Sequence, residues 1–286
     1  NPTSTLRLEL KYGPNGELVW ATRSGSGSGR LSLAALAVDA AGNVYVAGGE
    51  TREAGNSDYV TIKYDPTGKE IWTAHRDWSA NDDARFLDVD AYGNAYVTGS
   101  SLRFTEDPEK TGHEDIATVK YDPDGEEIWT ASFNGGADAN DVVSALRLGP
   151  DGQVYVAGTS YRPGADHIAI QYDTDGTELW SAGYAGPGGT EDIAHAAVLD
   201  PMGGFYVLGS ERGSPDRKPW LVTVKFAADG SGRWVARDEG VATGGAGTLA
   251  VDREGSVWIT GGDAGGQDFL TIKYAQSQTE ADAGKP

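Results

Sequence analysis

The chain has no cysteine and a single methionine among its 286 residues. It can therefore form no disulfide, and it offers no thiolate as a nucleophile or metal ligand. It also lacks any apolar run close to the roughly 20 residues that a membrane-spanning helix requires. Insertion into a membrane is not expected from this composition.

Positive charge and histidine are scarce as well. The chain has 23 Lys and Arg against 43 Asp and Glu, for a net charge of −20, and it has four His. Such a surface repels nucleic acid and anionic membranes, and it suits cations, basic partners or simple solubility. No Ser-His-Asp order, zinc motif or phosphate-binding loop is present. Support for catalysis is weak, and the sequence favours a protein that is not an enzyme.

What the chain does contain is a repeated stretch: a strand with a period of two, a turn that ends in Gly, and a second strand that ends in Trp. Its copies are LRLELKYGPNGELVW (6–20), DYVTIKYDPTGKEIW (58–72), DIATVKYDPDGEEIW (115–129), DHIAIQYDTDGTELW (166–180), WLVTVKFAADGSGRW (220–234) and, truncated, DFLTIKY (268–274). Because the Trp recurs at one fixed place, we expect it to pack into a shared apolar layer.

A second stretch precedes the later copies: a short strand, a turn that ends in Gly, and a strand with Tyr or Trp at a fixed place. Its copies are LAVDAAGNVYVAGG (36–49), LDVDAYGNAYVTGS (87–100), LRLGPDGQVYVAGT (146–159), AVLDPMGGFYVLGS (197–210) and LAVDREGSVWITGG (249–262). Together the two stretches give four strands, a to d, roughly every 50 residues, a period typical of propellers and repeat arrays. The chain then contains five a, five b and five d strands but six c strands.

This pattern predicts an all-β propeller formed by residues 1–275 as a single domain, with residues 276–286 as a flexible polar tail. We predict five four-stranded blades closed with strands from both termini, because such closure removes free sheet edges. Six blades, two of them incomplete, are the alternative, and a solenoid is the rival architecture. The surplus c strand could lie outside the first d strand, be displaced, or complete a neighbouring molecule.

The motif V-D-x-x-G-x-x-Y-V-x-G followed by D-x-x-T-I-K-Y-D-x-x-G-x-x-x-W resembles the bacterial β-propeller repeat called SBBP, over about residues 6–274. The chain departs from it in blade number, in Gly149, which replaces the turn Asp, and in Trp220, which replaces the Asp before strand c. The resemblance implies a secreted or cell-surface bacterial protein and carries no established catalytic residues. We therefore expect an extracellular, cell-surface or periplasmic location. Asn1 is not an initiator Met, which predicts a processed or trimmed form.

The a–b and c–d turns are uniform, whereas the b–c and d–a loops on the opposite face vary. Variable loops on a rigid scaffold are where β-folds commonly place binding. The aromatic residues there could stack on sugar rings or anchor a protein partner, or they could pack beneath the loops. The candidate ligand-binding residues on this face are Trp78, Arg85, Phe104, Tyr161, Tyr184, His195 and Trp220. Trp220 is the strongest of them, since other copies carry Asp at its place.

Three carboxylates, Asp82, Asp141 and Asp192, align just before strand a of three successive repeats. They could ring the mouth of a central channel and hold Ca²⁺, which prefers several oxygen ligands. The simpler interpretation is that they are solvated loop carboxylates that accept hydrogen bonds from local backbone groups, and no other cofactor is expected. Asp88 and Arg147 share a place on adjacent a strands and are predicted to form an ion pair.

Three functions stay open at this point. The first is a secreted, non-catalytic propeller that binds a protein or saccharide partner through the variable loops. The second is a glycan-active enzyme with carboxylates at the channel mouth. The third is a structural subunit that self-assembles by strand addition through its surplus strand.

Overall fold

The computed structural model describes residues 7–24, 30–51, 55–78, 80–103, 112–136, 139–161, 166–186, 192–211, 220–238, 241–242, 247–263 and 268–275. These segments form strands and turns and contain no helix. No helix long and apolar enough to cross a membrane is present among them.

The strands follow the order a-b-c-d that the repeats predict. The a strands are β3 (Arg30–Val38), β7 (Asp82–Val89), β11 (Asp141–Leu148), β15 (Asp192–Leu199) and β20 (Thr248–Val251). The b strands are β4 (Val44–Thr51), β8 (Ala95–Arg103), β12 (Val154–Ser160), β16 (Phe205–Glu211) and β21 (Val257–Asp263). The c strands are β1 (Arg7–Tyr12), β5 (Ser57–Tyr64), β9 (His113–Tyr121), β13 (Asp166–Tyr172), β17 (Trp220–Phe226) and β22 (Phe269–Tyr274). The d strands are β2 (Leu18–Ser24), β6 (Glu70–Arg76), β10 (Glu127–Phe133), β14 (Glu178–Tyr184) and β18 (Arg233–Asp238), and a short β19 (Val241–Ala242) is additional.

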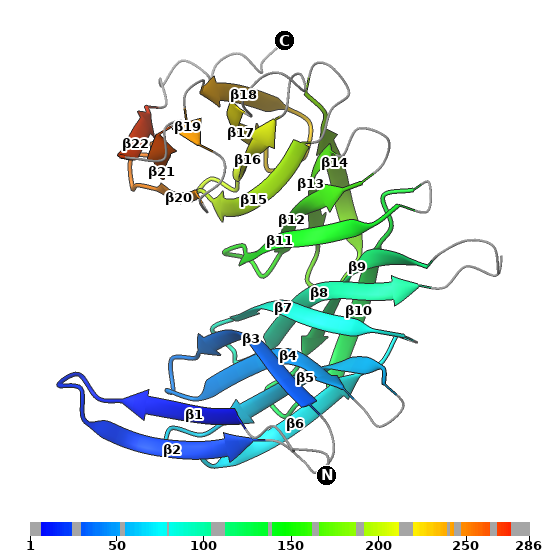
Figure 1. The fold of residues 1–286 in the computed structure, drawn as a ribbon, viewed down its shortest axis with the longest axis vertical. Helices are drawn as coiled ribbons and strands as arrows, with labels where there is room; N and C mark the ends of the chain where they lie inside the picture. Colours follow the sequence, from blue (N-terminus) through cyan, green and yellow to red (C-terminus); the bar gives the residue numbers. More distant parts are fainter. Residues whose placement is uncertain are drawn as a thin grey trace. The chain divides into compact units, whose positions relative to one another are not determined.

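The described strands form six antiparallel sheets (Figure 1). Their orders are β1-β2, β3-β4-β5-β6, β7-β8-β9-β10, β11-β12-β13-β14, β15-β16-β17-β18 and β19-β21-β20 with β22 on the other edge of β21. The all-β class and the four-stranded repeat are therefore confirmed. Closure into a ring and the number of blades stay predictions, as does the single domain over residues 1–275.

The chain divides into two compact units. The first contains residues Asn1–Leu148 and Asp173–Thr177, and the second contains Gly149–Tyr172 and Glu178–Pro286. Each unit has its own apolar core.

In the first unit, consecutive sheets stack face to face. Tyr45 and Tyr59 of the β3–β6 sheet share one buried cluster with Val97 and Val119 of the β7–β10 sheet. The b and c strands β4 and β5 are buried along almost their whole length, whereas the outer strand β6 is at most half-buried, on alternate residues. The inner strands therefore have apolar neighbours on both faces, as packed sheets require.

The second unit repeats this arrangement. Tyr206, Leu208 and Leu221 of the β15–β18 sheet cluster with Leu249 and Ile259 of the β20–β22 sheet.

Where a turn begins with Asp, the carboxylate of that Asp closes the turn. In the a–b turn after β3, Asp39 Oδ1 accepts the backbone N–H of Ala41 and of Asn43, both at 2.9 Å. Asp65 does the same in the c–d turn after β5, accepting from Thr67 and Lys69. This is an Asx-type turn, which explains why Asp recurs there and why Gly follows three residues later.

Consecutive repeats are joined by what we call the Trp–turn contact. In four of the five d strands, the indole Nε1 donates to a backbone carbonyl in the c–d turn of the next repeat: Trp20 to Pro66 (3.1 Å), Trp72 to Pro123 (3.0 Å), Trp129 to Thr174 (3.0 Å) and Trp180 to Ala228 (3.1 Å). The same ring lies flat against that turn's glycine, where a Cβ would come within 2.5–2.7 Å of it. The recurring Trp therefore packs between repeats, as its fixed place predicts.

The Trp–turn contact predicts a difference between two glycines of equal backbone conformation. Gly125→Ala adds a Cβ 2.7 Å from Trp72 Cδ2 at φ +89°, whereas Gly42→Ala adds one 3.6 Å from Pro66 at φ +84°. Both lose about 1–2 kcal/mol to the left-handed backbone, and Gly125→Ala loses roughly 1–3 kcal/mol more through overpacking. Equilibrium denaturation measures both. Equal losses would show that the ring does not depend on the glycine.

Candidate functional site

Antiparallel pairing sends the a–b and c–d turns to one end of each sheet and the b–c and d–a loops to the other. We call the second the loop end. At the turn end, the carboxylates are occupied: Asp39 Oδ2 accepts from Asn43 Nδ2 (2.7 Å) and from the Tyr45 hydroxyl (3.2 Å), in addition to the two backbone bonds of Oδ1. A carboxylate whose two oxygens already accept these hydrogen bonds stabilises the turn and has little capacity left to bind a ligand.

The three carboxylates predicted as metal ligands share one local role at the loop end. Asp82 Oδ2 accepts the backbone N–H of Trp78 (2.8 Å), Asp141 Oδ2 that of Gly135 (2.7 Å), and Asp192 Oδ2 that of Gly186 (2.5 Å). All three side chains are buried rather than solvated. Each therefore closes its own d–a loop at the start of strand a, which matches the simpler interpretation except for the burial.

Only Asp82 belongs to a group able to hold a metal ion among the residues the structure describes. One carboxylate oxygen from each of Asp58, Asp77 and Asp82 lies within 4.8 Å of the others. Burial raises the pKa of Asp82, and the charges of Asp77 and Asp58 raise it further. A hard cation would relieve this repulsion, and carboxylate oxygens are the ligands that Ca²⁺ prefers. Asp141 and Asp192 do not belong to this group. A Ca²⁺ ion bound at Asp82 would therefore have Asp58 and Asp77 as ligands in place of the two predicted residues.

Terbium luminescence tests the calcium prediction. Tb³⁺ resembles Ca²⁺ in its preference for oxygen ligands, and Trp78, whose backbone N–H donates to Asp82, provides a nearby indole to excite it. An ion held here gives emission that Asp77→Asn abolishes and that Asp141→Asn leaves in place. Emission that is absent, or equally lost in both variants, would contradict a site at this group.

Asp192 lies in a second buried charged group, in the second unit. Burial raises its pKa to about 6, and the charges of Glu211 and Asp166 act in the same direction, while the Gly186 N–H and Arg237 oppose them. The folded protein therefore binds this proton more tightly than the unfolded chain does. The resulting stabilisation is present below the ordinary pKa of 3.8 and is lost as the pH rises through about 6.

Asp192→Asn is expected to stabilise the protein at pH 7, because the amide oxygen can still accept from Gly186 without burying a charge. The gain should vanish at pH 4, where the wild-type carboxyl is protonated. Melting temperatures measured between pH 4 and 7 test this.

Asp229→Asn serves as the matched control in the same unit. Hydrogen bonds from Ser231 lower the pKa of that exposed carboxyl, so its contribution has the opposite sign and its removal should destabilise the protein at pH 7. A pH-independent effect of Asp192→Asn would contradict the assignment.

Tyr184, predicted as a ligand-binding residue, is a buried part of this second group. Its hydroxyl donates to Glu211 Oε2 (2.5 Å) and accepts from Arg237 Nη2 (2.5 Å), and Arg237 Nε donates to the same Glu211 oxygen (2.9 Å). Its ring packs against His167 with the centroids 5.6 Å apart. The side chain of Tyr184 is therefore saturated and does not present itself to a ligand.

Two further candidates lie in the first unit. Trp78 is half-buried, with its ring edge-on to Tyr59 (4.7 Å between centroids) and under the guanidinium of Arg76 (4.9 Å). It thus packs beneath its loop. Arg85 is exposed and pairs with Asp83 at 3.5 Å. Phe104 lies outside the described residues.

The other three candidates lie in the second unit. Tyr161 follows β12 and is 42% exposed. Trp220 begins β17 and is half-buried, and His195 is half-buried with Nε2 3.1 Å from Ser210 Oγ. Tyr161 and Trp220 are the aromatic candidates of this unit whose side chains remain accessible to a ligand.

The predicted Asp88–Arg147 pair takes a weaker form than expected. Burial raises the pKa of Asp88, and the charge of Arg147 opposes this rise. Arg147 Nη1 donates instead to the carbonyl of Leu146 at 2.7 Å. No direct ion pair joins the two side chains in the described structure, and their interaction is a longer-range one.

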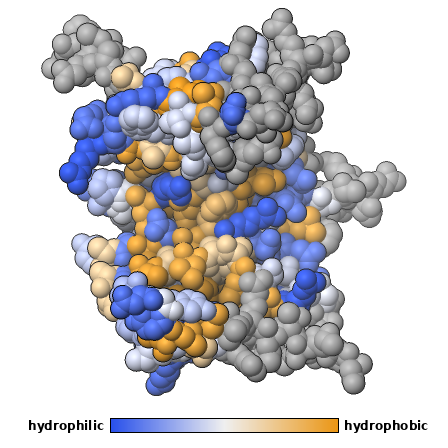
Figure 2. Space-filling view, turned by 60° about the vertical axis from the view of Figure 1, so that its left-hand side comes forward, coloured by the Kyte–Doolittle hydropathy of each residue, from blue (hydrophilic) through white to orange (hydrophobic). Residues whose placement is uncertain are grey.

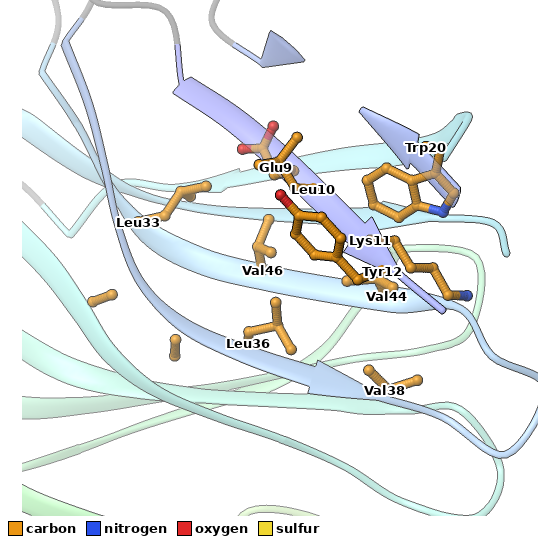
Figure 3. A pocket seen from close by; sticks show the side chains of 12 residues that line it. Glu9, Leu10, Lys11, Tyr12, Trp20, Leu33, Leu36, Val38, Val44 and Val46 are labelled. Carbon is orange, nitrogen blue, oxygen red and sulfur yellow. The ribbon is translucent and has the colours of Figure 1, made fainter. Parts of the chain in front are cut away.

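An apolar groove of about 540 Å³ in the first unit was not predicted from the sequence. Tyr12, Lys11 and Trp20 lie on one side of it, and Leu36 and Val38 on the other (Figure 3). Figure 2 shows apolar side chains reaching the surface in its lower half, at the height where β1 and β3 lie in Figure 1. The alternating Leu36 and Val38 gave no signal, because the same pattern occurs on the other a strands, where it is covered.

Comparisons with known proteins place the chain by its fold alone. No family model matches the sequence, and no curated protein matches it. A mutant of the apocarotenoid oxygenase of Synechocystis has a TM-score of 0.52 at 10% identity, and an ACO/RPE65 chimera has 0.53 at 10%. Each match covers 92% of this chain and 64% of the other, so the chain spans less than two thirds of their length. An endo-arabinase from Bacteroides thetaiotaomicron matches at a TM-score of 0.39, with 11% identity, over 82% of this chain and 89% of its own.

Proposed function

We propose that the chain is a secreted or cell-surface β-propeller without catalytic activity, which binds a protein or saccharide partner through the loop end of its sheets. Its fold would have five four-stranded blades, the last completed with strands from both termini, and six blades are the alternative. The SBBP-like repeat supports this location and architecture.

The observation that carries the proposal is the contrast between the two ends of each sheet. The turn end repeats one structure, in which Asp39, Asp90, Asp122 and Asp173 each accept two backbone N–H groups. The loop end has a different sequence in every repeat and carries the exposed Arg85 and Tyr161 and the half-buried Trp220. A scaffold that keeps one end constant and varies the other is typical of binding proteins.

The glycan-active enzyme is favoured less. Asp82, Asp141 and Asp192, the carboxylates proposed for that role, are 0–1% exposed and hold their own loops. A glycosidase needs two carboxyl groups in contact with the sugar, and these three would first have to release the backbone groups they bind.

A glycan array and a pull-down with immobilised protein test the proposal. Tyr161→Ala and Trp220→Ala are expected to weaken binding about tenfold each, the usual effect of losing an aromatic anchor. Tyr92→Ala is the matched control, because Tyr92 is 83% exposed but lies in an a–b turn at the other end. Loss of binding in Tyr92→Ala alone would contradict the loop end as the site, and turnover of a bound glycan would contradict the absence of catalysis.

A further inference from the structure

The d–a loops of three successive repeats begin in the same way. In each loop, the second residue after strand d donates its backbone N–H to the carboxylate that starts the next strand a: Trp78 to Asp82, Gly135 to Asp141 and Gly186 to Asp192. The residue just before that N–H differs, being Asp77 in the first of these loops, Asn134 in the second and Ala185 in the third. The second loop therefore places an asparagine directly before a glycine at this point.

An asparagine followed by glycine can react within its own chain. The backbone nitrogen of the glycine attacks the amide carbon of the asparagine, expels ammonia and closes a succinimide ring. The glycine has no side chain to hinder this close approach. The reaction is accelerated by a base that takes the proton of the attacking N–H, by a donor to the amide oxygen and by an acid that protonates the departing nitrogen.

The fold supplies a base and an oxygen donor at the pair Asn134–Gly135. The Gly135 N–H donates to Asp141 Oδ2 at 2.7 Å, and Asp141 is buried, so water does not compete for this hydrogen bond. Asn134 Oδ1 accepts the backbone N–H of Gly136 at 2.8 Å. This second hydrogen bond closes an Asx-type turn that contains both the Asn134 Cγ and the Gly135 nitrogen. The two atoms that must join are thus held within one tight turn.

An imidazole lies beside the amide nitrogen that would leave. His113 Nε2 is 3.3 Å from Asn134 Nδ2 and 3.4 Å from Asp115 Oδ1. A proton on this nitrogen can therefore pass to the amide nitrogen as it departs. The other side of the turn is open, because Asn134 is exposed and no atom of the described residues, chain neighbours aside, comes within 4 Å of a Cβ placed on Gly136. Ammonia can leave and water can enter from that side.

We propose that Asn134 deamidates by itself in the folded protein. Asp141 is the base, the Gly136 N–H is the donor to the amide oxygen, and His113 is the acid. Asp141 takes the proton of the Gly135 N–H, and the nitrogen forms a bond with Asn134 Cγ. The Cγ–Nδ2 bond breaks, Nδ2 takes a proton through His113 Nε2, and ammonia leaves a succinimide. Water then opens the ring at one of its two carbonyl groups and leaves aspartate or isoaspartate at position 134. All of these residues belong to the first unit.

The reaction adds a carboxylate at the place that Asp77 occupies one repeat earlier. Asp77 shares a group there with Asp58 and Asp82, and the residues at the places of Asp58 and Asp82 in the next repeat are Asp115 and Asp141. Opening to aspartate therefore gives that repeat the same set of carboxyl groups, and opening to isoaspartate lengthens the loop backbone by a methylene group. Either product is a one-way change at the loop end that needs no enzyme, and it is independent of the partner that binds there.

Mass spectrometry of proteolytic peptides tests the proposal, with Asn15 as a reference in the same chain. Asn15–Gly16 is the other Asn–Gly pair of the sequence, and its Gly16 N–H donates to the Gly13 carbonyl (2.9 Å) rather than to a carboxylate. In the folded protein at neutral pH, Asn134 is expected to convert about tenfold faster than Asn15, or more. In urea the two rates should become similar. Equal rates in the folded protein, or a slower Asn134, would overturn the proposal.

Asp141→Asn retains an oxygen for the Gly135 N–H but removes the base. It is expected to slow the conversion of Asn134 about tenfold or more and to leave that of Asn15 unchanged. Asp192→Asn is the matched control, because Asp192 accepts the same kind of loop N–H but has no asparagine before it. Circular dichroism checks that both variants stay folded.

The pH dependence separates the built-in base from the solvent. Without Asp141, the rate should rise in proportion to the hydroxide concentration, whereas in the wild type it should rise less steeply. A rate at Asn134 that Asp141→Asn does not change, or that falls equally in Asp192→Asn, would contradict the role of Asp141 and overturn the proposal.

Discussion

The Trp–turn contact is the interaction on which the described structure depends most. It joins an indole donor, a turn carbonyl and a glycine whose missing side chain leaves room for the ring. One such hydrogen bond contributes about 1 kcal/mol, and the ring adds aromatic contacts with Tyr45 and Tyr121 on the two sheets that it joins. The Pro123 carbonyl that accepts from Trp72 also accepts from Lys63, at 2.8 Å. Two side chains of one repeat thus meet at a single atom of the next, and this fixes how neighbouring sheets stack.

Much of this fold could be predicted from the sequence, because each type of strand recurs five or six times. The period of two in Val60, Ile62 and Tyr64 identifies a strand, and the Asp and Gly of the turns identify its end. What the sequence could not predict is which sheet supplies the neighbour at the two ends of the array. Leu36 and Leu146 occupy the same place in their repeats, and only the packing shows that Leu36 is exposed and Leu146 is buried.

The candidate site shows the same limit for polar residues. The alignment of Asp82, Asp141 and Asp192 predicted a common role, and they have one, but it is to close loops from a buried position. Their sequence neighbours gave no sign of Asp58, which approaches Asp82 from a different sheet. Likewise Tyr184 was predicted from its loop, whereas its hydroxyl is engaged by Glu211 and Arg237 from strands further along the chain. Such partners are set by tertiary packing, which a loop position does not reveal.

The Trp–turn contact spans two consecutive repeats, and this limits how the number of repeats can change. Each contact is divided between two periods, with the donor in one and the acceptor in the next. If a whole period is duplicated or lost, each of these indole donors still has an acceptor carbonyl in the next repeat, wherever in the period the change begins. Gain or loss of half a period would leave an indole without its turn. We therefore expect genetic exchange between copies to preserve this joint only where it adds or removes whole repeats.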